Sequence, residues 1–174
     1  MESSRVIFIG GRSGVGKSAV AFEMHRLLSE RGIRHAVIEG DCLDLAYPAP
    51  WEHHLAERNL AAMWGNYRQL GYRRLIYTNT VAVLEQASLI AAMGDSPVAT
   101  SVLLRANDAT AVQRLAARER GESLRQHIEH SSAAATRLDD HAGNDVHRVD
   151  TDDRSPALVA DRIIKLSGWA AVVG

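Results

Sequence analysis

The sequence predicts a three-layer α/β fold in which one five-stranded parallel sheet lies between two layers of helices. Three observations support this prediction. Short apolar runs rich in β-branched residues alternate with segments of helical spacing along the whole chain. A glycine-rich loop at residues 11–18 separates the first predicted strand from the first predicted helix. The 174 residues contain no internal repeat, linker or low-complexity segment, so we expect a single domain spanning residues 1–174.

The first half of the chain contains two strand–helix pairs. Each strand is a short apolar run, and each helix ends at a glycine, which adopts the left-handed conformation that stops a helix. In order, we expect a strand at residues 5–9, a helix at 19–31 with Gly32 at its end, a strand at 35–39 and a helix at 51–70 with Gly71 at its end.

The second half continues the alternation with three further strands. Asn107 or Asp108 caps one helix, and Ser155 followed by Pro156 begins the last one, because these pairs suit the first positions of a helix. Crossover helices between successive strands make the strands parallel. In order, we expect a strand at 74–78, a helix at 81–93, a turn at 94–97, a strand at 98–104, a helix from the cap to residue 120 with a glycine at 121, a helix at 123–138, a strand at 146–149 and a helix at 156–166.

The loop at residues 11–18 matches the phosphate-binding pattern G-x-x-x-x-G-K-[ST] without a mismatch. Its glycines lack Cβ atoms, so the backbone can curl and direct N–H groups at phosphates. A lysine then neutralises the β- and γ-phosphates, and a serine hydroxyl binds Mg²⁺. A chance glycine turn is the alternative, which the flanking strand and helix disfavour. The predicted nucleotide-binding residues of the loop are Gly11, Arg12, Ser13, Gly14, Val15, Gly16, Lys17 and Ser18, with Ser18 also the metal ligand.

Composition limits the classes of partner. A formal net charge of -1 argues against a dedicated nucleic-acid binder, which usually has a basic surplus. No apolar stretch reaches the length of a membrane span, and the polar N-terminal residues do not form a signal peptide. The single cysteine, Cys42, cannot form an internal disulfide, which is typical of the cytoplasm. We therefore expect a cytoplasmic protein with a small-molecule substrate and no nucleic-acid or membrane partner; the oligomeric state is open.

Two other classes of nucleotide-binding protein fit the sequence poorly. The chain lacks the Asn-Lys-x-Asp motif with which GTPases bind guanine. The strand at 74–78 leads into neutral residues, Asn79 and Thr80, whereas motor and transporter ATPases need a strand that ends in carboxylates. A compact kinase remains.

The chain resembles the small P-loop kinases of the nucleoside monophosphate kinase-like fold, which include adenylylsulfate kinase, gluconate and shikimate kinases and chloramphenicol phosphotransferase. The phosphate-binding loop and the stretch Ile38-Glu39-Gly40-Asp41, similar to the Asp-Gly-Asp of adenylylsulfate kinase, are the basis of this resemblance. The resemblance implies ATP with Mg²⁺ as the phosphoryl donor, a hydroxyl of a small molecule as acceptor and a short helical lid at about residues 114–130. The asparagine-valine-arginine continuation of adenylylsulfate kinase is missing, so a metabolite, a nucleoside or an antibiotic stays possible as acceptor.

Transfer to a hydroxyl requires a carboxylate that accepts the proton of the attacking oxygen. Asp41, which directly follows the second strand, is the predicted base because ligands bind at the carboxyl ends of parallel strands. Its alternative role is that of a turn or helix-cap residue. Asp44 is the second candidate and a predicted substrate-binding residue.

The resemblance also assigns roles to arginines. Arg114 corresponds to an arginine that lies against the adenine, and Arg118 to a catalytic arginine that reaches the triphosphate. Their i, i+4 spacing places both on one helix face, and Arg120 lies beside them. The alternative is a solvated face that pairs with Glu119 and Glu122.

Four further positions have two interpretations each. Arg58 lies where the related kinases carry arginines, and this resemblance implies that it grips an anionic acceptor; the alternative is a hydrated face. Asn79 either binds an acceptor hydroxyl or caps the next helix. Trp51 and Trp64 either stack on a substrate ring or pack in the core.

Thr151 belongs to the loop at 150–153 that closes over the adenine in the related kinases. The competing function is an ATP-binding regulatory or resistance protein that hydrolyses ATP slowly without an acceptor, since the neutral end of the third strand leaves Mg²⁺ few ligands.

Overall fold

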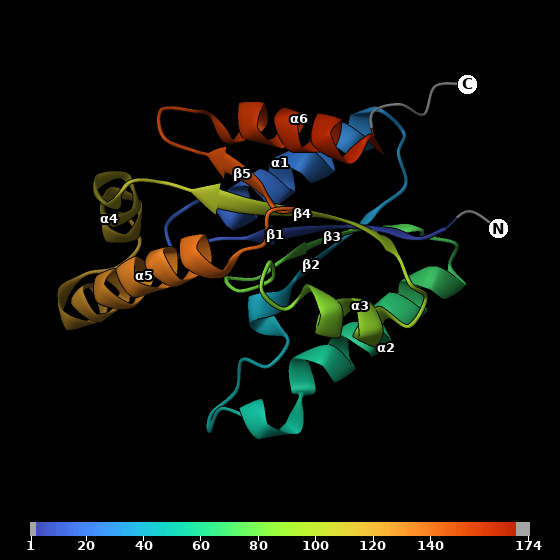
Figure 1. Cartoon of the computed structure of the whole chain (residues 1–174), viewed down its shortest axis with the longest axis horizontal. Helices are drawn as coiled ribbons and strands as arrows, with labels where there is room; N and C mark the ends of the chain where they lie inside the picture. The colour runs from blue at the N-terminus through green and yellow to red at the C-terminus, as the bar shows by residue number, and fades with distance from the viewer. Residues whose placement is uncertain (1–2, 170–174) are drawn as a thin grey trace.

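The computed structural model describes residues 3–169 and confirms the predicted α/β fold (Figure 1). All strand pairs of the sheet are parallel, in the order β2-β3-β1-β4-β5. The strands are β1 (Arg5–Gly10), β2 (Ala36–Glu39), β3 (Arg74–Thr78), β4 (Val98–Arg105) and β5 (His147–Asp150). The helices are α1 (Lys17–Glu30), α2 (Leu55–Gln69), α3 (Gln86–Met93), α4 (Asp108–Ala116), α5 (Gly121–His141) and α6 (Pro156–Ser167), and 3₁₀ turns occur at η1 (Gly40–Cys42) and η2 (Trp51–His53).

The sheet is buried on both faces because successive strand side chains point to opposite sides. Ile7 and Ile9 of β1 belong to the hydrophobic cluster that α1 and α6 complete. Val6 and Phe8 belong to the cluster that α2 and α3 complete on the opposite face. Figure 1 shows these two helix pairs above and below the sheet. The predicted three layers are therefore present.

Strand order determines where a crevice opens at the edge of the sheet. The chain leaves β1 for β2 at one edge of the sheet, and after β3 it crosses past β1 to β4. The connections of the neighbouring strands β1 and β3 thus leave in opposite directions, which opens a crevice at their carboxyl ends. The phosphate-binding loop follows β1, and Asn79 follows β3.

Three helix boundaries differ from the prediction by four residues or more. His54 has a φ of 48°, so the predicted helix at 51–70 is divided into η2 and α2. The predicted helix at 81–93 begins only at Gln86, since turns occupy the residues before it. The helix that carries Arg114 ends at Ala116 rather than at residue 120. After a short turn, the longer helix α5 begins at Gly121.

The predicted helix caps are confirmed. Asn107 accepts a hydrogen bond from the N–H of Thr110 at 2.8 Å, and Ser155 accepts one from the N–H of Leu158 at 3.3 Å. Pro156 is the first residue of α6. None of the helices within residues 3–169 has the length and apolar character needed to cross a membrane.

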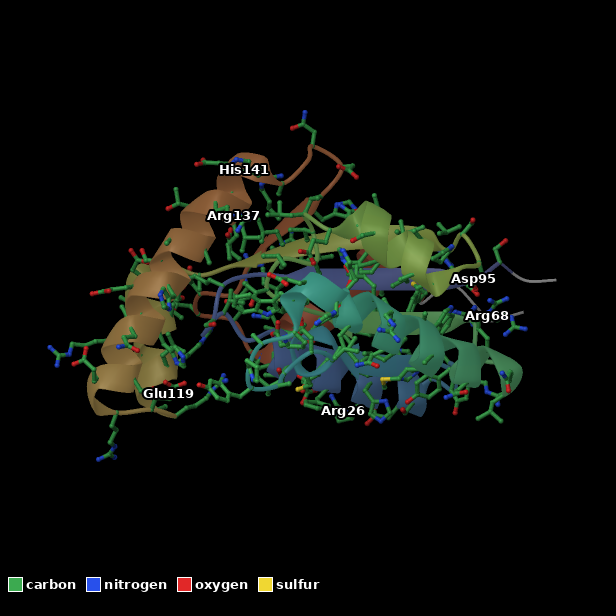
Figure 2. All side chains as sticks on the ribbon, turned by 90° about the horizontal axis from the view of Figure 1, so that it is seen from below. Arg26, Arg68, Asp95, Glu119, Arg137 and His141 are labelled. Carbon is green, nitrogen blue, oxygen red and sulfur yellow. The ribbon has the colours of Figure 1, made fainter. Side chains whose placement is uncertain are left out.

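Trp64 is a fully buried core residue of α2, so the interpretation that it packs in the core is confirmed. Its Nε1 donates to Oδ1 of Asp95 at 3.3 Å, and Arg68 Nε forms an ion pair with Oδ2 of Asp95 at 3.1 Å. Figure 2 shows Arg68 and Asp95 together at one end of the molecule. These contacts fix α2 to the turn after α3, and they make Trp64 unavailable for stacking on a substrate.

A histidine pair joins α1 to the segment before β2. His35 is buried, and its Nδ1 donates to the carbonyl of Ile33 at 2.7 Å. The Nε2 of the neutral ring therefore accepts a hydrogen bond from Nδ1 of His25 at 2.9 Å. Burial lowers the pKa of His35, a charge on His25 lowers it further, and the bond to Ile33 opposes both effects.

We expect the free energy of unfolding to fall as the pH drops below about 6.5, the ordinary pKa of histidine. The folded state keeps His35 neutral to a lower pH than the unfolded state does. Below about pH 6.5 the unfolded state therefore binds more protons, and the stabilising contribution of the neutral ring is fully present only above this pH. One proton contributes at most about 1.4 kcal/mol per pH unit. Urea unfolding midpoints measured above and below this pH test the effect. His35→Gln reduces the slope, whereas the exposed control His141→Gln does not; equal slopes in all three proteins contradict the assignment.

Candidate active site

The phosphate-binding loop curls at the carboxyl end of β1, as its glycines predict. Gly11, Gly14 and Gly16 have φ values of 147°, 83° and 99°, in the left-handed region that favours glycine. Gly14 also lies against α4: a Cβ atom there would come within 2.7 Å of the carbonyl oxygen of Ala111. The loop therefore holds its shape only with glycine at this position.

Gly14→Ala is expected to destabilise the fold and to weaken nucleotide binding about tenfold or more, the loss of roughly one charge-assisted hydrogen bond. The positive φ alone costs about 1–2 kcal/mol, and the contact with Ala111 adds to that cost. Gly32→Ala is the matched control, since Gly32 also has a positive φ, of 65°, but no atom within 4 Å of its added Cβ. Chemical denaturation and nucleotide titration measure both variants; equal effects on both would show that the contact with α4 is unimportant.

Lys17 lies across its own loop. Its Nζ donates to the carbonyl of Gly11 at 2.8 Å and lies 3.5 Å from Oγ1 of Thr80. Burial lowers the pKa of Lys17; the charge of Asp41 opposes this effect, and the charge of Arg118 adds to it. Asp41 and Arg118 thus both act electrostatically on Lys17, although the three residues come from separate parts of the chain.

Two pockets adjoin at this edge of the sheet. The P-loop pocket, of about 190 Å³, is formed by the loop, the start of α1 and the segment between α4 and α5. The strand-end pocket, of about 510 Å³, is formed by the residues after β2 and β3 and by the start of α2. Ser13, Gly14, Gly16, Lys17, Ser18, Asp41, Leu115, Arg118, Glu119 and His127 line the P-loop pocket. Asp41, Asp44, Trp51, His54, Leu55, Ala56, Glu57, Tyr77, Asn79, Thr80, Val81, Glu85 and Leu89 line the strand-end pocket.

Asp41 is the one described residue that lines both pockets. It lies on η1 directly after β2, and its Oδ1 accepts a hydrogen bond from the N–H of Thr80 at 3.3 Å. Gly40 permits this position, because a Cβ atom there would overlap the hydroxyl of Tyr77 at 2.3 Å. A carboxylate at the boundary of two pockets can contact a molecule in each.

Thr80 is a site residue for which the sequence indicated only a neutral position after the third strand. Its carbonyl accepts from the N–H of Gly11 at 3.1 Å, its N–H donates to Asp41, and its hydroxyl faces Lys17. Thr80 thereby joins the phosphate-binding loop to η1. Its place at the carboxyl end of a central strand is the signal that pointed to it.

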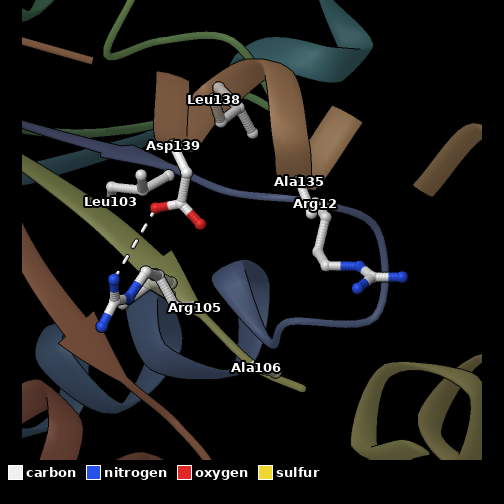
Figure 3. Close-up of a pocket in the computed structure, with 8 residues that line it drawn as sticks. Arg12, Leu103, Arg105, Ala106, Ala135, Leu138 and Asp139 are labelled. Atoms are coloured by element: carbon white, nitrogen blue, oxygen red, sulfur yellow. Dashed lines mark ion pairs between the residues drawn. The ribbon is translucent and has the colours of Figure 1, made fainter. Parts of the chain in front are cut away.

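The side chain of Arg12 points away from the P-loop pocket. It is buried behind the loop, where Nε donates to the hydroxyl of Ser131 at 2.8 Å and Nη1 pairs with Asp108. It lines a small cavity of about 30 Å³ that also contains the Arg105–Asp139 ion pair (Figure 3). Arg12 thus fastens the loop to α4 and α5.

Arg114 and Thr151 also lie behind the loop. Nη1 of Arg114 donates to the carbonyl of Val15 and to Oγ1 of Thr151, both at 3.0 Å. Thr151 is buried, and its hydroxyl lies 3.1 Å from the carbonyl oxygen of Val15. Both residues hold the loop against the ends of β4 and β5, and neither lines the P-loop pocket.

Arg118 lines the P-loop pocket from the segment between α4 and α5. The alternative pairing with Glu119 and Glu122 is not the one found: Glu119 bonds to His127, and Glu122 to Arg125. The sequence placed Arg114 and Arg118 on one helix face, but α4 ends at Ala116 and Arg118 lies beyond it. The turn between α4 and α5 therefore positions Arg118. Glu119 and His127 are pocket residues that sequence reasoning missed, since they meet only where α5 folds back.

The predicted acceptor residues divide into two groups. Asp44, Asn79 and Trp51 line the strand-end pocket. Asn79 lines the pocket, and its Oδ1 accepts from the N–H of Val81 at 2.9 Å in the turn after β3. The predicted helix-cap role is wrong, because α3 begins only at Gln86 and its N-cap residue is Glu85. Arg58 is exposed on α2 and does not line this pocket.

The donor set of the P-loop pocket fits Mg²⁺. The exposed Ser18 and the carboxylate of Asp41 both line it, and Mg²⁺ binds to oxygen ligands of this kind together with phosphates and water. The chain therefore offers the Ser18 hydroxyl as a ligand, the carboxylate of Asp41 lines the same pocket, and a bound triphosphate would supply further oxygen ligands.

Comparison with known proteins agrees with this architecture. A family model of adenylylsulphate kinase matches residues 3–59, about a third of the chain. The sequence has no significant match among curated proteins.

Three similar solved structures extend over almost the whole chain. The tunicamycin resistance protein of Deinococcus radiodurans has 20% sequence identity and a TM-score of 0.64, over 95% of this chain and 96% of that one. Shikimate kinase from Acinetobacter baumannii, in complex with shikimate, has 17% identity and a TM-score of 0.59, over 99% and 97%. The APS kinase of Mycobacterium tuberculosis, in complex with AMPPNP and APS, has 19% identity and a TM-score of 0.56, over 95% and 98%. The chain therefore has the fold of the small P-loop kinases, as predicted.

Proposed function

We propose that this protein transfers the γ-phosphoryl group of ATP to a hydroxyl group of a small molecule. The position of Asp41 at the boundary of the two pockets supports this proposal most directly, because phosphoryl transfer needs a donor and an acceptor side by side with a base between them. The similarity to solved kinases and to the adenylylsulphate kinase model supports it further.

The triphosphate occupies the P-loop pocket and the acceptor occupies the strand-end pocket. Asp41 accepts the proton of the acceptor hydroxyl as that oxygen forms a bond to the γ-phosphorus. The bond between this phosphorus and the bridging oxygen breaks, and ADP leaves with the electron pair. Thr80 holds the Asp41 carboxylate through its N–H, which keeps the base directed at the boundary.

Positive groups stabilise the charge of the transferred group. Lys17 and Arg118 both line the P-loop pocket and supply fixed donors where negative charge develops. Ser18 would hold Mg²⁺ together with phosphate oxygens, and the ion would neutralise charge on the β- and γ-phosphates when bound. Arg12, Arg114 and Thr151 act indirectly, because they fasten the loop from behind.

The test is ADP release by the purified protein with ATP and Mg²⁺, first alone and then with pools of nucleosides, sugar acids, amino sugars and hydroxyl-bearing antibiotics. We expect ADP release that depends on one pool, together with a product heavier than its acceptor by one phosphoryl group in mass spectrometry. Slow ADP release that no pool stimulates would contradict the proposal and favour the ATP-binding regulatory or resistance protein.

A cytoplasmic location and the absence of nucleic-acid partners remain predictions of the sequence. Both are consistent with a kinase that uses cellular ATP.

A further inference from the structure

We propose that the acceptor is a hydroxyl compound that also carries a protonated amine, rather than an anionic compound. This inference rests on the proposed function, because it assigns the strand-end pocket to the acceptor. It concerns the charge of the ligand, which the chemistry of phosphoryl transfer does not determine.

Carboxylates surround the strand-end pocket. Asp41 and Asp44 come from the segment after β2, Glu57 from α2 and Glu85 from the residue before α3. Among the described residues that line the pocket there is no lysine or arginine. Within the described chain, Asp44 and Glu85 have no ion pair, and the partner of Glu57 is His54, 3.7 Å away, which is charged only when protonated.

The carboxylates act on one another and on the pocket wall. Burial raises the pKa of Glu85, and Glu57 and Asp44 raise it further, while Arg137 on α5 (Figure 2) opposes the effect from outside the pocket lining. Burial also raises the pKa of Tyr77, and the charge of Asp41 adds to the rise. Concentrated negative charge without a cation in the pocket favours a ligand that brings one.

The two pockets have opposite character. The P-loop pocket contains Lys17 and Arg118, which suit an anionic triphosphate. The strand-end pocket repels anions, and Arg58, the arginine predicted to grip an anionic acceptor, is exposed outside its lining. A carboxylate or sulfate on the acceptor would face Asp44, Glu57 and Glu85 without a compensating cation in the pocket wall.

The pocket suits an organic cation rather than a metal ion. Within residues 3–169, no three His, Cys, Asp or Glu side chains are close enough together to hold one ion. The carboxylates instead surround a space of about 510 Å³, within the range of small-molecule sites. Trp51, 75% exposed at the pocket, offers an aromatic face to an ammonium group or a ring.

The experiment compares probes that share a carbon skeleton and differ in charge: glucosamine, glucose and gluconate, with kanamycin as a larger polyamine. Binding is measured by calorimetry in the presence of Mg²⁺ and AMPPNP, and phosphoryl transfer by ADP release with ATP. We expect kanamycin or glucosamine to bind at least about tenfold more tightly than gluconate, the effect of roughly one charge-assisted contact.

Binding and turnover separate the two claims. If an amine binds best and is phosphorylated, both are supported. If it binds best without stimulating ADP release, the inference about the pocket stands, and the proposed function is contradicted only when the acceptor pools also fail to stimulate ADP release. If gluconate binds best, or if no amine binds, the inference is overturned. Turnover of gluconate would overturn it while supporting the proposed function.

Variants connect the preference to the pocket. Glu57→Gln and Glu85→Gln should each weaken amine binding by about tenfold and weaken glucose binding less than amine binding, because each removes a charge and keeps the shape. Glu52→Gln is the matched control, since Glu52 is exposed on η2 and does not line the pocket. Equal affinities for the amine in all three variants and the wild type would overturn the inference even if individual probes bind.

Discussion

Asp41→Asn is expected to lower the acceptor-dependent turnover about 10²- to 10⁴-fold, the usual contribution of a general base. The amide keeps the size of the side chain and can still accept the hydrogen bond of Thr80, but it cannot take the proton of the acceptor. Nucleotide binding should change little, because the loop amides and Lys17 remain. Steady-state ADP release and nucleotide titration measure the two properties separately.

Asp140→Asn is the control for this substitution, since Asp140 is exposed on α5 and lines neither pocket. Full activity of Asp140→Asn beside an inactive Asp41→Asn, with both folded by circular dichroism, assigns the loss to the site. An active Asp41→Asn would remove Asp41 as the base and leave Asp44 as the carboxylate to test.

Lys17→Met is expected to reduce kcat/KM for ATP by about 10²- to 10³-fold, as for the loss of one donor to developing negative charge. The methionine has a comparable length and keeps the apolar part of the side chain, so the change removes the charge and the hydrogen bond to Gly11. The effect should appear in turnover with every acceptor, in contrast to changes in the strand-end pocket.

Lys165 is the second of the two lysines in the sequence and supplies the control. It lies on α6, where it pairs with Asp161 at the surface, so Lys165→Met should keep wild-type kinetics and lose at most about 1 kcal/mol of stability. If Lys17→Met and Lys165→Met had the same turnover, the P-loop pocket would not be the triphosphate site.

Local patterns were sufficient for much of the fold. The order of strands and helices follows from periods of two and 3.6 residues and from boundary signals that act within a few residues of themselves, such as Gly32 at the end of α1 and Ser155 at the start of α6. The phosphate-binding loop was recognisable because its chemistry requires fixed spacing within eight positions. Helix ends were less predictable where a single residue such as His54 adopts a left-handed conformation.

Side-chain direction within the site was not predictable from the sequence. The loop pattern groups Arg12 with the nucleotide-binding residues, yet its guanidinium is buried against Ser131, which is more than a hundred positions away in the chain. Likewise, Arg114 matches the position of an adenine-binding arginine, and the structure bonds it to Val15 and Thr151. A motif specifies the backbone of a loop, whereas the partners of a long side chain depend on which distant helix packs behind it.

The sequence by itself determined the nucleotide loop, the parallel sheet and the carboxylate after β2, because each depends on neighbouring residues. Only the tertiary structure decided that Asp41 lies between two pockets, that Thr80 joins it to Lys17, and that carboxylates rather than Arg58 surround the second pocket. These features combine strand ends and helices that are remote in the chain, and the parallel sheet brings them to one edge. The charge of the pocket is thus a property of the folded arrangement, and no single segment contains it.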